Sequence, residues 1–151
     1  MTTRAVPQMP EGTGVVPSAV GVPAYNHLFP REAESAFLVR QLVRTVLETW
    51  HLPQLVEDAV QVASELVANA VDHARGHCIR FTMTRTGDRR VRIAVVDKSR
   101  AEPILRAVSS SEERGRGLAV VDAFSEQWGV DPLPWGKRVW AECALPVEGA
   151  Q

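Results

Sequence analysis

Several signals of specialised protein classes are missing from this 151-residue sequence. It has only two cysteines, Cys78 and Cys143, far apart and without the short Cys/His spacing of a zinc site, so we expect two reduced core thiols. No apolar run is long enough to span a bilayer, and the first residues lack the basic-then-apolar order of a secretory signal. The expected location is therefore cytoplasmic, with no membrane partner.

An excess of charge of either sign is also missing. The 17 basic and 18 acidic side chains leave a net charge of -1, so no global field attracts nucleic acid or an anionic membrane. We expect no direct nucleic-acid partner, although a local basic patch stays open. The sequence contains neither a GxxxxGK[ST] loop nor a full GxGxxG, so it supports neither a P-loop nor a Rossmann site.

What is present is enough apolar sequence for one ordinary domain, since 45% of the residues are hydrophobic. Residues 1–24 are rich in Pro and Gly without periodicity and predict a flexible tail. The alternative for this segment is a strand donated to a partner. Residues 25–147 form the predicted domain, and 148–151 form a C-terminal tail.

Two amphipathic helices are expected early in the domain, after a short edge strand at 25–29 that Pro30 ends. The first helix runs from about Arg31 to Trp50, and Pro53 separates it from a second helix between about Leu55 and Ala74. Apolar residues recur at helical spacing in both and predict these buried faces: Val39, Leu42, Val43, Val46, Leu47 and Trp50 in the first, and Ala59, Val60, Ala63, Leu66, Val67, Ala70 and Ala74 in the second.

Strand patterns dominate the second half. Alternation at 79–83 and 91–95 around the turn at 86–89 predicts a β-hairpin. Residues 98–114 have no usable periodicity and are longer than an ordinary loop. We then expect a helix from Gly117 to Ser125, a strand at 127–130, a Pro/Gly-rich turn, and a strand at 138–145. This order favours an α+β fold with helices on one face of the sheet.

Polar residues form one stripe along the second helix. Glu65, Asn69 and Asp72 are spaced i, i+4 and i+7, with His73 alongside. One interpretation is a solvated helix edge. The other is an oxygen-rich wall in which a carboxylate accepts a hydroxyl proton and an amide oxygen helps to hold Mg²⁺.

Two further candidate sites follow in the chain. Asp97 ends the apolar strand 91–96 and is either a strand-terminating acid or a buried acceptor for an exocyclic amino group. The segment Gly115-Arg116-Gly117-Leu118 precedes the third expected helix. Its glycines either permit the backbone conformation in which a loop enters a helix, or allow phosphate to approach free backbone amides.

Three segments together resemble the nucleotide-binding boxes of the GHKL (Bergerat-fold) ATPases, in particular anti-sigma-factor serine/threonine kinases of actinobacteria. They are Ser64-Glu65-Leu66-Val67-Ala68-Asn69-Ala70-Val71-Asp72-His73-Ala74, then Val95-Val96-Asp97-Lys98-Ser99 through Pro103, and Gly115-Arg116-Gly117-Leu118-Ala119-Val120-Val121-Asp122. The resemblance implies a two-layer α/β sandwich, with a mixed, mostly antiparallel sheet covered on one face by about three helices.

The resemblance also implies roles for single residues. Glu65 would be the general base, Asn69 the Mg²⁺ ligand, and Asp97 the acceptor for the adenine amino group. Residues 98–116 would form a lid over the phosphates. The full ATP-binding set that it implies is Asn69, His73, Asp97, Ser99, Gly115, Arg116, Gly117 and Leu118.

The implied function is an ATP- and Mg²⁺-dependent anti-sigma factor and serine/threonine kinase. Its partners would be a sigma factor and an anti-anti-sigma protein of the STAS type. One departure from the family pattern supports an alternative, because Lys98, Ser99, Arg100 and Ala101 follow Asp97 where wider GHKL sequences carry DxGxG. The alternative is a non-catalytic module that sequesters a transcription regulator.

The first helix is the candidate surface for partner contact, and a homodimer is left open. Arg40 and Arg44 repeat at i, i+4 on its exposed side, in a region that relatives use for dimerisation and sigma-factor contact. The other interpretation is a solvated i, i+4 ion pair between Arg44 and Glu48.

Overall fold

The computed structural model describes residues 16–17, 23–73, 76–98 and 112–146, with side chains for 23–73, 76–98 and 118–146. The elements appear in the order that the sequence predicts, with two helices before a hairpin and a third helix before a second hairpin. In chain order they are β1 Val16–Pro17, β2 Pro23–Pro30, α1 Ser35–Thr49, a 3₁₀ helix at Pro53–Leu55, α2 Val56–His73, β3 Cys78–Gly87, β4 Arg90–Asp97, α3 Glu112–Phe124, β5 Gln127–Leu133 and β6 Gly136–Ala144.

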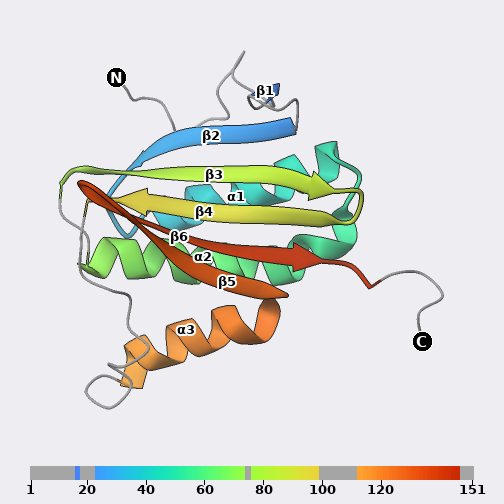
Figure 1. The fold of residues 1–151 in the computed structure, drawn as a ribbon. Coiled ribbons are helices and arrows are strands. Elements are labelled where there is room, and N and C mark those ends of the chain that lie inside the picture. Colours follow the sequence, from blue (N-terminus) through green and yellow to red (C-terminus); the bar gives the residue numbers. More distant parts are fainter. Residues whose placement is uncertain (1–15, 18–22, 74–75, 99–111, 147–151) are drawn as a thin grey trace.

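The six strands form one sheet in the order β1-β2-β3-β4-β6-β5, and every described pairing is antiparallel. Helices α1 and α2 pack against each other behind the sheet, and α3 contacts α2 and β5 (Figure 1). The predicted α+β sandwich is confirmed, but the sheet of the described strands is antiparallel and not mixed as expected. None of the helices in the described ranges has the length and apolar character needed to cross a membrane.

One hydrophobic core fills the space between the sheet and the helices. All six residues predicted for the buried face of the first helix are buried. On α2, Val62 is fully buried where Val60 was expected, and Val60 is only partly buried. Ala74 lies outside the described residues.

The start of the domain differs from the prediction. Strand β2 begins at Pro23 and is not an edge strand, because Val16 and Pro17 pair with its first residues. Helix α1 begins at Ser35 instead of Arg31, since residues 31–34 form a turn that leaves β2 and the Ser35 hydroxyl donates to the Pro30 carbonyl at 2.7 Å. The domain limits at 25 and 147 stay predictions, and most of the predicted tails lies outside the described residues.

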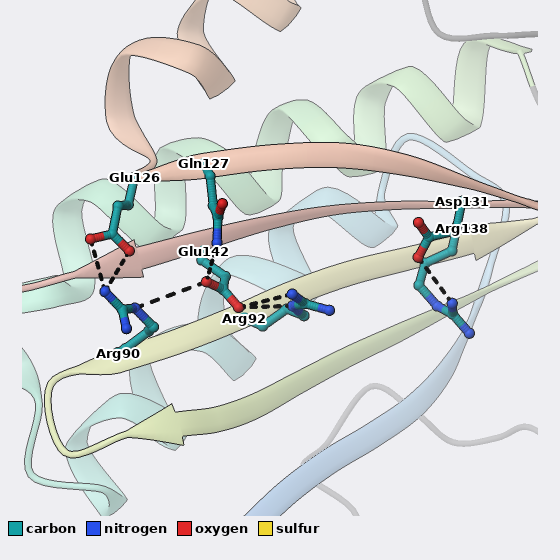
Figure 2. Close-up of polar contacts among 7 residues, drawn as sticks. All are labelled: Arg90, Arg92, Glu126, Gln127, Asp131, Arg138 and Glu142. Carbon is teal, nitrogen blue, oxygen red and sulfur yellow. Dashed lines mark hydrogen bonds and ion pairs between the residues drawn. The ribbon is translucent and has the colours of Figure 1, made fainter.

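The open face of the sheet carries a network of charged and polar side chains toward the end of β4 opposite Asp97 (Figure 2). The Glu142 carboxylate, only 6% exposed, accepts hydrogen bonds from Arg92 at 3.0 Å and Gln127 at 2.9 Å. Arg92 also lies 4.2 Å from the ring centroid of Trp140. These contacts join β4, β6 and β5, and so fix the three strands that lead to the candidate site.

The two cysteines occupy different environments, so the prediction of two core thiols was half wrong. Cys143 is buried on β6, where desolvation and then the charge of Asp58 raise the pKa of its thiol to about 12. Cys78 is the first residue of β3, and its side chain is exposed. An alternating strand places neighbouring residues on opposite faces, and Cys78 lies on the opposite face to Ile79.

This difference predicts thiol reactivity. With an aromatic disulfide reagent at pH 8, we expect Cys78 to react in the native protein, whereas Cys143 reacts only after unfolding in denaturant, because a buried neutral thiol is a poor nucleophile. Reaction can be followed by absorbance, with Cys78→Ser as the control that should remove the native signal. Rapid release of two equivalents from the folded protein would contradict the assignment.

Candidate functional site

The polar stripe of α2 borders the buried face of the helix. Glu65, Asn69 and His73 are half-buried, at intervals of four residues, whereas Asp72 is exposed. Desolvation raises the pKa of the Glu65 carboxyl above its usual range. A carboxylate that holds a proton more readily is a better proton acceptor, so the position suits general-base chemistry. The simple solvated edge therefore describes Asp72 but not Glu65 or Asn69.

Asp97 is the last residue of β4, and it is buried. Only 2% of Asp97 is exposed, and its Oδ1 lies 3.2 Å from Nζ of Lys137, which is also buried. The two residues are register partners on β4 and β6, on the side of the sheet where Val95 and Val139 face the helices. The pair therefore lies between the sheet and the helical layer, not on the open face.

Backbone packing fixes this pair in place. A Cβ added at Gly136 would overlap the carbonyl oxygen of Asp97, so the close approach of β6 to β4 requires glycine here. Sequence reasoning did not select Lys137 or identify this role of Gly136. The signal that could have found Lys137 is its place two residues before Val139, in line with the alternating apolar positions Val139, Ala141 and Cys143.

The carboxyl ends of α2 and β4 meet at the same end of the molecule, on the left in Figure 1. Gly76, just after α2, has a φ of 87°, and the Cδ of Lys98 lies 3.2 Å from where its Cβ would be. The side chain that follows Asp97 thus packs over the turn that follows His73. The structure thereby brings together the first two candidate segments.

Arg31 holds the end of α2 in this position. Its Nη1 donates to the Val71 carbonyl and its Nε to the Gly76 carbonyl, both at 2.8 Å. Its backbone amide donates to the carbonyl of His77, also at 2.8 Å. The bond to Val71 satisfies a carbonyl that the helix end leaves without an internal partner, and the other two hold the segment after the helix. Arg31 is therefore a positioning residue that the sequence pattern did not reveal.

The third candidate segment differs from expectation in its secondary structure. Helix α3 begins at Glu112, so Gly115, Arg116 and Gly117 lie inside it and not in a loop before it. The expected start at Gly117 was wrong by about a helical turn. Leu118 is buried against Trp128, on β5. Ser99 and most of the predicted lid lie outside the described residues, and a phosphate-binding role for the glycines stays a proposal.

The arginines of α1 are accessible. Arg44 is exposed and Arg40 is half-buried. The ion pairs found among the described side chains do not include one between Arg44 and Glu48. The solvated-pair interpretation is therefore not realised here, and partner contact through these arginines stays a proposal.

The polar stripe of α2 offers only part of a set of metal ligands. Within the described ranges, no three His, Cys, Asp or Glu side chains are grouped closely enough to bind a metal. Mg²⁺ commonly takes one or two protein oxygens and completes its shell with phosphates and water. The amide oxygen of Asn69 can supply such a ligand.

Known proteins are similar to this chain in sequence and in fold. A family model described as the histidine kinase-like ATPase domain matches residues 29–142. The chain is similar to an anti-sigma F factor of Pasteuria penetrans, at 32% identity over 122 residues that cover 72% of this chain and 75% of that protein. It also resembles the crystal structure of the RsbU and RsbW domains of Rv1364c from Mycobacterium tuberculosis, with a TM-score of 0.63 and 22% identity over 83% of this chain. The chain spans 33% of that solved chain, and this second likeness concerns the fold alone.

Proposed function

The chain belongs to the histidine kinase-like (GHKL) ATPase family, in the anti-sigma-factor kinase-like group, and from this premise we propose that it is an ATP-binding anti-sigma factor that phosphorylates a partner protein. The partner would be an anti-anti-sigma protein with an acceptor serine or threonine, and a sigma factor would be the second partner. The single observation that carries the catalytic part is Glu65, a partly desolvated carboxylate with a raised pKa, one helical turn from Asn69.

In this proposal each residue of the site has a separate role. Asp97 accepts a hydrogen bond from the adenine amino group, and Asn69 supplies an oxygen to Mg²⁺. Bound ATP and Mg²⁺ supply the transferable phosphoryl group and stabilise its charge. Glu65 accepts the proton of the attacking hydroxyl. His73, Ser99, Arg116, Leu118 and the glycines at 115 and 117 belong to the proposed nucleotide site on resemblance alone.

A specific observation favours the second candidate, a module that sequesters a regulator without phosphoryl transfer. The carboxylate of Asp97 already contacts Lys137, and the residue after it is Lys98 with its side chain over Gly76. In this arrangement adenine would have to share Asp97 with a lysine. Tight partner binding with no nucleotide binding would select this candidate.

Calorimetry with ATP and Mg²⁺ tests the proposed site. The native chain should bind ATP, and Asn69→Ala should bind it about 10- to 100-fold more weakly in Mg²⁺, the range seen when groups that support a metal are lost. In EDTA the two proteins should bind ATP alike, because Asn69 acts through the metal.

The matched control is Asn26→Ala. Asn26 is exposed on β2 and accepts a hydrogen bond from Arg80 at 3.0 Å, so it lies on the open face of the sheet. This variant should bind ATP as the native chain does. Absence of ATP binding by the folded native chain would refute the proposal, and equal binding by Asn69→Ala in Mg²⁺ would refute the role of Asn69.

A further inference from the structure

The chain contains only two lysines, and both lie at the proposed nucleotide site. The other 15 of its 17 basic side chains are arginines. Lys98 follows Asp97 directly and is exposed, whereas Lys137 is paired with Asp97 and only 4% exposed. Removing an ammonium group from water is costly unless specific partners compensate. The Asp97 carboxylate is such a partner, so the ion pair holds a charged donor and a charged acceptor together at the proposed site.

Strand register fixes the position of the Lys137 ammonium. Asp97 and Lys137 are directly opposite on antiparallel strands, with 3.2 Å between Nζ and Oδ1. Gly136 lets the two backbones approach at this point. The result is a hydrogen-bond acceptor beside a charged donor, in the layer between the sheet and the helices.

We propose that Lys137 is a second base-reading residue, which donates a hydrogen bond to N1 of adenine while Asp97 accepts one from the 6-amino group. The inference rests on the proposed function. The Watson–Crick edge of adenine presents an amino donor next to a ring-nitrogen acceptor, and the Asp97–Lys137 pair presents the complementary acceptor and donor side by side. Asp97 alone would read only the amino group, so Lys137 determines recognition of the ring nitrogen.

The chemistry of the pair also separates adenine from guanine. Guanine carries a carbonyl oxygen at position 6 and a ring N–H at position 1, so in the proposed orientation the oxygen would face the Asp97 acceptor and the N–H would face the Lys137 donor. ATP binding in preference to GTP is therefore part of the proposal. Because the ammonium carries its charge close to the base, its hydrogen bond is of the stronger, charge-assisted kind.

Modified nucleotides test the proposal on the native chain. In calorimetry with Mg²⁺, 1-deaza-ATP, which has C–H in place of N1, should bind at least about tenfold more weakly than ATP. Purine riboside triphosphate, which lacks the 6-amino group, should show a similar loss through Asp97. With ¹⁵N-lysine labelling, the Nζ signal of Lys137 should shift strongly with ATP and much less with 1-deaza-ATP.

Two variants complete the test. Lys137→Met should bind ATP and 1-deaza-ATP with equal affinity, whereas Arg80→Met, at an exposed position on β3 beside Asn26, should keep the tenfold difference. If circular dichroism shows that Lys137→Met is unfolded, the modified nucleotides and the ¹⁵N-lysine spectra of the native chain decide whether Lys137 contacts N1 of adenine. Equal binding of the two nucleotides by the native chain, an undiminished difference in folded Lys137→Met, or tighter binding of GTP would overturn the role of Lys137 and leave the proposed nucleotide site intact. Failure of the native chain to bind any of these nucleotides would overturn the proposed function together with this inference.

Discussion

Glu65→Gln is expected to lower the rate of phosphoryl transfer to a partner hydroxyl by about 100- to 10,000-fold, the usual contribution of a general base. The amide has nearly the shape of the carboxylate but cannot accept the proton at neutral pH. ATP binding should change little, because residues other than Glu65 make the proposed contacts with adenine and with Mg²⁺. Transfer can be followed with γ-labelled ATP and an STAS-type anti-anti-sigma protein, and ATP affinity by calorimetry.

A matched substitution on the same helix provides the control. Glu57 is exposed in the first turn of α2, eight residues before Glu65 and on the same side of the helix. Glu57→Gln should transfer phosphate at the native rate. The catalytic assignment would be wrong if both variants kept the native rate, or if Glu65→Gln lost ATP binding in parallel with transfer.

The raised pKa of Glu65 predicts how the transfer rate depends on pH and how Glu65 affects the free energy of unfolding. The active form is deprotonated, so the native rate should rise as pH increases through this pKa, which lies above the usual range for Glu. Because the pKa is higher in the folded state than in the unfolded state, the charged carboxylate slightly favours unfolding at neutral pH. Glu65→Gln removes this effect, so we expect no loss in its free energy of unfolding by urea denaturation.

Periodicity predicted most of the fold because the helices and strands are amphipathic. The six apolar positions of α1 and the alternation of β3 and β4 each identify one buried face, and burying those faces on one another gives the two layers. Helix ends were less predictable. Glycine disfavours a helix by about 1 kcal/mol, so Gly115 and Gly117 suggested a loop, but contact with α2 and the acidic residues at 112–113 support an earlier start of α3.

Contacts between distant segments could not be predicted from local patterns. The expected last strand began at Arg138, which left Lys137 in the turn before it. In the structure β6 begins at Gly136, and the register opposite β4 then places Lys137 beside Asp97. Lysine is also rarely buried, so its default placement is in solvent. Asp97 itself was found because its place at the end of an apolar strand is a local property.

The same register predicts the largest effect on stability. Asp97→Asn and Lys137→Met should each lower the free energy of unfolding by about 3–5 kcal/mol, because each removes the ion-pair partner of a buried charge. The double variant Asp97→Asn/Lys137→Met should be much less destabilised than the sum of the two, since it leaves no buried charge. Urea denaturation of the four proteins gives the coupling energy of the pair directly.

The measured stability of Asp97→Asn also decides how weak ATP binding by this variant is to be interpreted. If Asp97→Asn is partly unfolded, weak ATP binding by this variant reports the lost fold and not the lost contact with adenine. The folded double variant removes that ambiguity, because it lacks the charges of both base-reading groups and leaves no buried charge. Additive destabilisation by the two substitutions would mean that Asp97 and Lys137 do not interact in solution, and both the pair and its proposed role in reading adenine would then have to be abandoned.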